Sequence, residues 1–279
     1  MEKLGPIFTA DLFPQIDGEL INLLKSLSLD DWDRPTVAPL WKVKDVAAHL
    51  LDGNIRGISI LRDSFFGVKA EGLDSYQDMV GFLNKLNADW VNAFKRASPA
   101  SLIELLEYTG KKYCEVISNL NPFEEAPFSV AWAGEEKSFN WFHIAREYTE
   151  KWHHQQQIRL AVSREEDLYC KKYYWPYLET SMRALTHHYR DIKGRSGDLI
   201  SFTITGDGGG TWLLYSNGES WSLTEERDNE PITHVEIDGA VAWRIFTKGI
   251  KKSDAQANVA ISGKTDLGEK IFDMLAVMA

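Results

Sequence analysis

The spacing of apolar residues changes once along this chain, near Ser163, and that change constrains the fold more than any other feature. Up to about residue 165, apolar residues recur every three or four positions, which is the period of a helix with one buried face. Beyond that point, short alternating segments are separated by glycine, asparagine and aspartate, as in strands joined by turns. We therefore predict a helical bundle over residues 1–165 and a smaller α+β sheet domain over residues 166–279.

Long amphipathic helices joined by short turns favour an up-and-down antiparallel bundle for the first domain. The expected helices cover residues 8–27, 43–66, 75–97, 99–120 and 140–162. In the second domain we expect helices over 168–192, 239–247 and 264–278, and strands over 199–204, 211–215, 219–223, 234–238 and 257–262.

The charge balance excludes two classes of partner. The chain carries 31 Lys and Arg against 41 Asp and Glu, and this net charge of −10 repels nucleic acids and anionic membranes. Cys114 and Cys170 are expected to be free thiols of a reducing compartment. No signal-peptide layout and no apolar run of about 20 residues is present, so we expect a soluble, cytoplasmic protein. The sequence leaves the oligomeric state open.

Ionisable groups gather on one stretch of the helix expected over residues 140–162. His143, Glu147, Glu150 and His154 follow one another at spacings of four, three and four, so they share one helical face. A row of this kind is a normal charged surface if it faces solvent. If it faces the bundle, the groups need partners or a metal ion. His153 is predicted to point away from the row and to lie at the surface.

Three of these side chains predict a metal site. Glu150 and His154 are one turn apart and can converge on one ion about 2 Å from each. His49 is the candidate third ligand, because no other histidine falls in the first four helices. Two neutral imidazoles and a carboxylate suit Zn²⁺, and Ni²⁺ or Fe²⁺ would also fit. Three protein ligands leave one position open, as in catalytic zinc sites.

Two segments of the chain resemble the signatures of one family. Trp41-Lys-Val-Lys-Asp-Val-Ala-Ala-His49-Leu50 is similar to the W-x-V-x-D-V-x-x-H-L signature of the DinB-like superfamily, closest to the N-terminal domain of mycothiol-dependent maleylpyruvate isomerases. Glu150 to His154 is similar to the second signature of those isomerases, E-x-x-x-H, and the segment that runs on to Gln157 also resembles the DinB-type H-x-x-x-H-x-x-Q-I. The resemblance covers roughly the first 165 residues. It implies that His49, Glu150 and His154 bind a divalent metal.

The second domain resembles, more loosely, the domain of sterol-carrier-protein type that follows the bundle in those isomerases. The likeness rests on the order of strands, the helix around Trp243 and the segment 262–264 before the last helix. The isomerases carry a Gly-Arg step where this chain has Gly249 followed by isoleucine. Lys248 or Lys251 would then supply the basic group for an acidic substrate.

The resemblance implies an enzyme with a low-molecular-weight thiol as cosubstrate. The metal-bound thiolate would attack a small electrophile, giving cis–trans isomerisation or transfer of the thiol. Glu147 and His143 are candidates for handling protons or supporting the ligands. One alternative is a non-catalytic metal-containing protein that binds a small apolar ligand among Trp212, Trp221 and Trp243. The other is a plain helical bundle without metal.

Overall fold

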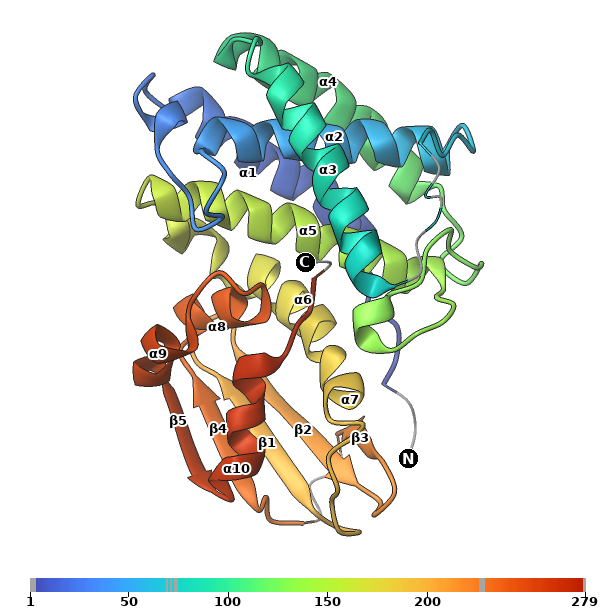
Figure 1. The fold of residues 1–279 in the computed structure, drawn as a ribbon, viewed down its shortest axis with the longest axis vertical. Coiled ribbons are helices and arrows are strands. Elements are labelled where there is room, and N and C mark those ends of the chain that lie inside the picture. Colours follow the sequence, from blue (N-terminus) through green and yellow to red (C-terminus); the bar gives the residue numbers. More distant parts are fainter. Residues whose placement is uncertain (1–3, 69, 71, 73–74, 226–228, 278–279) are drawn as a thin grey trace. The chain divides into compact units, whose positions relative to one another are not determined.

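The computed structural model of the protein describes residues 4–68, 70, 72, 75–225 and 229–277. These residues form two compact units: one contains residues 9–121 and 150–165, and the other contains residues 4–8, 122–149 and 166–277. The long helix α5 (Asn140–Ala161) therefore contributes its second half to the first unit and its first half to the second. The predicted fold class, a helical N-terminal region followed by a sheet domain, is confirmed (Figure 1). The predicted boundary between residues 165 and 166 stays a prediction.

The first unit is helical. It holds α1 (Phe13–Ser26), α2 (Val43–Leu61), α3 (Tyr76–Phe94), α4 (Pro99–Ser118) and the second half of α5. Ser75 and Ser98 cap α3 and α4, because their hydroxyl oxygens accept backbone N–H groups of the first turn. The helix predicted over 43–66 ends at Leu61, and Ser64 then adopts a left-handed conformation with φ of 54°.

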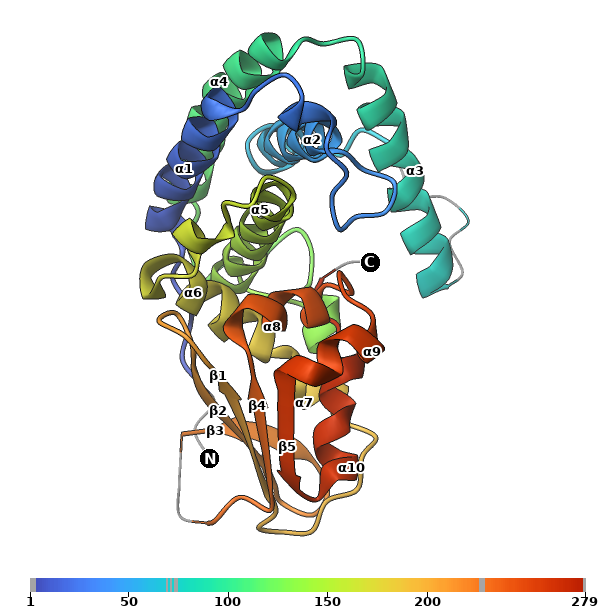
Figure 2. The same cartoon turned by 90° about the vertical axis from the view of Figure 1, so that its left-hand side faces the viewer.

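The second unit is built on a five-stranded sheet. Its strands are β1 (Leu199–Ile204), β2 (Gly210–Ser216), β3 (Trp221–Thr224), β4 (Thr233–Ile237) and β5 (Val259–Gly263), in the order β3-β2-β1-β4-β5. Strands β1 and β4 are parallel and the other neighbours are antiparallel. The helices α8 (Gly239–Phe246), α9 (Lys252–Ala255) and α10 (Thr265–Gly268) lie on one side of the sheet (Figure 2). Thr233, Val235 and Ile237 of β4 are buried, whereas His234 and Glu236, which alternate with them, are exposed.

Two helices of the second unit differ from the prediction. The segment predicted as one helix over 168–192 forms α6 (Lys171–Met182) and α7 (Ala184–His188), with Arg183 between them. The helix predicted over 264–278 is reduced to α10 and a following 3₁₀ turn, and Met278 lies outside the described residues. Among the residues described, no helix combines the length and hydropathy needed to cross a membrane.

Candidate metal centre

The first turn of α2 positions His49. The Asp45 carboxylate accepts the backbone N–H of Lys42 at 3.0 Å, which satisfies one of the free donors at the start of the helix. Val43 and Val46 are fully buried and hold that helix against the core. One turn further on, the His49 ring lies beside the Trp41 indole, with 4.8 Å between the ring centroids. The residues of the signature around Trp41 therefore have structural roles. Asp45 caps the helix, Val43 and Val46 pack in the core, and Trp41 contacts the ring of His49.

The second half of α5 supplies the other groups. Every residue from 151 to 159 is buried, although most of them are polar. Within this stretch, the Nε2 atom of His154 lies 3.6 Å from the Oε2 atom of Glu150. The carboxylate and the imidazole thus meet one turn apart, as the spacing predicted.

The structure brings His49 to this pair. The rings of His49 and His154 meet edge to face, with centroids 4.6 Å apart and planes at 73°. The Trp41 ring also borders His154, at 6.1 Å between centroids. Two helices that are distant in sequence therefore place the His49 ring against His154, which in turn lies beside the Glu150 carboxylate.

The side chain of Gln157 forms a hydrogen bond with the His154 ring and fixes which ring nitrogen carries a hydrogen. Its side-chain oxygen lies 2.9 Å from Nδ1 of that ring. Because an amide oxygen only accepts, Nδ1 carries the hydrogen of this bond, which leaves Nε2, the atom that faces Glu150, as the nitrogen available to a metal ion. A metal-ligating histidine commonly has its second nitrogen held in this way.

His49 also meets the requirements of a ligand. Its Nδ1 atom is buried and has no hydrogen-bond partner in the structure. Burial lowers the pKa of His49 well below its ordinary value, and the nearby charges of His154 and Arg56 lower it further, against the opposing effect of Glu150. The ring is therefore neutral at pH 7. An unpartnered buried nitrogen next to the His154 imidazole, which itself lies beside a carboxylate, fits a divalent ion such as Zn²⁺.

The prediction for His153 is wrong. Its side chain is buried rather than at the surface, and its Nδ1 atom lies 3.9 Å from Glu150 Oε2. Residues three apart on a helix are neighbours, as are residues four apart, so both His153 and His154 flank Glu150. Ligand atoms of these three residues all lie within 4.8 Å of one another.

His143 and Glu147 gather around Arg146. The Nη2 atom of Arg146 lies 3.1 Å from Nδ1 of His143 and 2.5 Å from Oε1 of Glu147. Burial, and then the charge of Arg146, lowers the pKa of His143 to about 4. Both residues lie in the half of α5 that belongs to the second unit. Their roles in proton handling or ligand support stay predictions.

The sequence interpretation missed a buried ion pair next to Glu150. The Lys151 ammonium donates to Asp17 Oδ1 at 2.7 Å and to Asn54 Oδ1 at 2.8 Å, which ties α5 to α1 and α2. A signal was present, because Asp17 follows the buried Ile16 and Asn54 interrupts the apolar stripe of α2. A polar residue on a buried face requires a partner, and Lys151 is that partner.

Two of the three tryptophans proposed to line an apolar pocket belong to the packed interior of the second unit. The indole of Trp221 donates to the carbonyl of Ile192 at 2.7 Å, and that of Trp243 donates to the Tyr169 hydroxyl at 3.1 Å. Trp212 lines a cavity of about 300 Å³ and donates to Glu179 at 2.7 Å.

The two lysines proposed to supply a basic group for an acidic substrate differ in their surroundings. The Lys248 ammonium donates to the carbonyl of Phe272 at 3.0 Å, and burial lowers its pKa. Lys251 is exposed.

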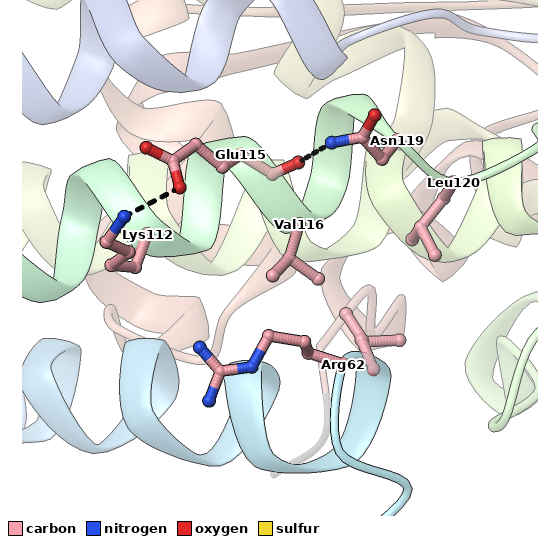
Figure 3. Close-up of a pocket in the computed structure, with 7 residues that line it drawn as sticks. Arg62, Lys112, Glu115, Val116, Asn119 and Leu120 are labelled. Atoms are coloured by element: carbon pink, nitrogen blue, oxygen red, sulfur yellow. Dashed lines mark hydrogen bonds and ion pairs between the residues drawn. The ribbon is translucent and has the colours of Figure 1, made fainter.

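A larger cavity, of about 390 Å³, lies between the C-terminal parts of α2 and α4 (Figure 3). Its wall carries Arg62 and Lys112, and the latter is paired with Glu115 at 2.9 Å. Arg62 is paired with Asp63 at 2.7 Å. None of the histidines or carboxylates of the candidate centre lines this cavity, so we do not assign the chemistry to it.

Comparisons with known proteins point to one family. The model of the mycothiol maleylpyruvate isomerase N-terminal domain matches residues 13–159. The crystal structure of the mycothiol-dependent maleylpyruvate isomerase is similar in fold, with a TM-score of 0.55, 10% identity and 91% of each chain covered. A mutant of that isomerase aligns over the same shares of both chains with 9% identity and a TM-score of 0.49. No curated protein sequence matches the chain.

Proposed function

The chain belongs to the mycothiol maleylpyruvate isomerase N-terminal domain family, and from this premise we propose that it is a metal-dependent thiol enzyme. In this proposal His49, Glu150 and His154 hold one divalent ion, with Zn²⁺ the first choice for such a donor set. The main support for this proposal is the contact between the His49 and His154 rings, whose centroids are 4.6 Å apart, together with the Glu150 carboxylate oxygen that lies 3.6 Å from Nε2 of His154.

Two further residues support the histidines of the centre. Gln157 holds the His154 ring in the tautomer that presents Nε2, and Trp41 borders both rings. A divalent ion bound there would lower the pKa of a coordinating thiol, so that it is present as thiolate at neutral pH. The cosubstrate we propose is a low-molecular-weight thiol, with mycothiol as the first to test.

The nucleophile has to come from the cosubstrate rather than from Cys114. Burial, and then the charge of Asp17, raises the pKa of the Cys114 thiol to about 12, so it stays protonated at neutral pH. Its sulfur lies 3.8 Å from the Asp17 carboxylate, among the packed groups of α1 and α4. This thiol is therefore a packing group and not a reactive one.

The reaction we propose is addition of the thiol to a small unsaturated electrophile. The thiolate forms a carbon–sulfur bond at one end of a carbon–carbon double bond, and rotation about the resulting single bond follows. Loss of the same thiolate then restores the double bond in the other geometry, which is a cis–trans isomerisation. If the adduct instead takes up a proton and leaves, the net reaction is transfer of the thiol to the electrophile.

Metal content and turnover test the proposal together. The wild type is expected to carry one ion per chain and to conjugate mycothiol to monochlorobimane, a reaction in which the activated thiolate displaces chloride and which therefore reports on thiolate formation, and a chelator should abolish this turnover. The His49→Ala variant should lose both the ion and the turnover. The matched control is His234→Ala, which removes an exposed histidine from β4 and should change neither. Retention of the ion by His49→Ala, or a wild type without metal, would contradict the proposal.

A further inference from the structure

We propose that His153 is a fourth protein ligand of the metal centre, so that three histidines and Glu150 hold the ion. The inference rests on the proposed function, because it presupposes an ion bound by His49, Glu150 and His154. It goes beyond that function because the three-ligand pattern of the family signatures contains no group at this position.

Distances around Glu150 carry the argument. Two atoms bound to one zinc ion at about 2.1 Å are at most about 4.2 Å apart, and about 3.4 Å apart at a tetrahedral angle. The Oε2 atom of Glu150 lies 3.6 Å from Nε2 of His154 and 3.9 Å from Nδ1 of His153. Both separations fall within the range that a shared ion requires. Relative to Glu150, His153 is therefore placed nearly as well as His154.

The helix places both imidazoles on the side of Glu150. At 100° per residue, His153 lies about 60° to one side of Glu150 and His154 about 40° to the other. Their rings lie 4.0 Å apart between centroids with planes inclined at 36°. A single turn of α5 thus carries three potential ligands, and His49 approaches from α2.

Burial distinguishes this cluster from an ordinary surface histidine pair. His153 is 4% exposed and His154 is 9% exposed. Two buried imidazoles beside a partly exposed carboxylate are a donor set that suits a divalent ion. If these four side chains held the ion, a thiol would have to bind as an additional ligand, and catalytic zinc sites sometimes expand to five-coordination.

Zinc affinity is the first measurement. A chromophoric chelator competes for Zn²⁺ with the wild type, His153→Ala and the control His234→Ala. His153→Ala should bind zinc at least about 100-fold more weakly, the upper limit of what loss of a supporting group outside the coordination sphere costs. His234→Ala should bind zinc as the wild type does. Circular dichroism of the metal-free proteins checks that each variant is folded.

A ligand swap gives a signature that a merely structural role cannot produce. In Co²⁺-substituted His153→Cys, a coordinating sulfur should add an intense thiolate-to-cobalt absorption in the near ultraviolet. The wild type should not show it, although it contains Cys114 and Cys170. The visible Co²⁺ bands of His153→Ala should also differ from those of the wild type, because a ligand has been removed.

The outcomes separate this inference from the proposed function. If wild-type protein binds one ion that His49→Ala loses, but His153→Ala binds as tightly as wild type and His153→Cys shows no sulfur band, His153 is not a ligand and the proposed function stands. If the wild type binds no ion at all, both fail. Weaker binding by His153→Ala together with the sulfur band supports four-ligand coordination.

Discussion

Removing the positive charge of Lys151 should destabilise the helical unit strongly. The Lys151 ammonium is 2.7 Å from the Asp17 carboxylate and 2.8 Å from the Asn54 side-chain oxygen, and it lies 5.2 Å from the centroid of the Tyr113 ring. The side chains of Lys151 and Asp17 are only 10% and 17% exposed. Lys151→Met keeps the aliphatic stem but leaves the Asp17 carboxylate without its counter-ion.

The expected loss follows from the burial of the pair. Breaking a buried ion pair by removing one partner costs about 3–5 kcal/mol, and the residual exposure of Asp17 argues for the lower end. We therefore expect Lys151→Met to lower the free energy of unfolding by about 3 kcal/mol. Urea denaturation followed by far-ultraviolet circular dichroism measures this as a lower midpoint with an unchanged slope.

A matched control separates burial from charge. Lys112→Met removes a lysine of α4 whose partner, Glu115, is 2.9 Å away, against 2.7 Å for Lys151 and Asp17, but the side chains of Lys112 and Glu115 are 42% and 62% exposed (Figure 3). This variant should lose less than about 0.5 kcal/mol, because water screens the pair. The double variant Lys151→Met with Asp17→Leu should regain at least half of the loss, since no buried charge then remains unpaired. Equal losses in Lys151→Met and Lys112→Met would refute the reasoning.

Three further predictions concern single side chains. Gln157→Leu removes the acceptor that orients His154, so zinc affinity should fall about 10- to 100-fold in a chelator competition, whereas Gln157→Glu should retain it. Because burial lowers the pKa of His143 from 6.5 to about 4, the folded protein resists protonation there. The stability from the neutral ring is complete above pH 6.5 and is lost as the pH falls towards 4, up to about 3 kcal/mol in urea unfolding, and His143→Gln should show a smaller decline. Cys114→Ala should leave thiol turnover within about twofold of wild type, because a thiol with a pKa of about 12 does not ionise at neutral pH, and a loss of turnover would count against an external thiol.

Helical spacing alone predicts some of the contacts in the candidate centre and not others. The convergence of Glu150 and His154 could be predicted, because residues four apart on a helix are neighbours in any surroundings. Residues three apart on a helix are also neighbours, so the same rule places His153 beside Glu150. The prediction left His153 out because it considered only the row that contains His143, Glu147, Glu150 and His154. The burial of His153 could not be predicted, because the spacing does not say how much of a helix is covered.

The amino-acid order alone carries the helical and strand periods, the one-turn spacing of Glu150 and His154, and the resemblance of Trp41–Leu50 to a family signature. These are local properties, set by 3.6 residues per helical turn and by alternation along strands. The packing of the folded chain is what brings His49 to His154, pairs Lys151 with Asp17 and divides α5 between the two units. Such pairings join residues about a hundred positions apart, and they depend on the packing of whole helices, which no local period encodes.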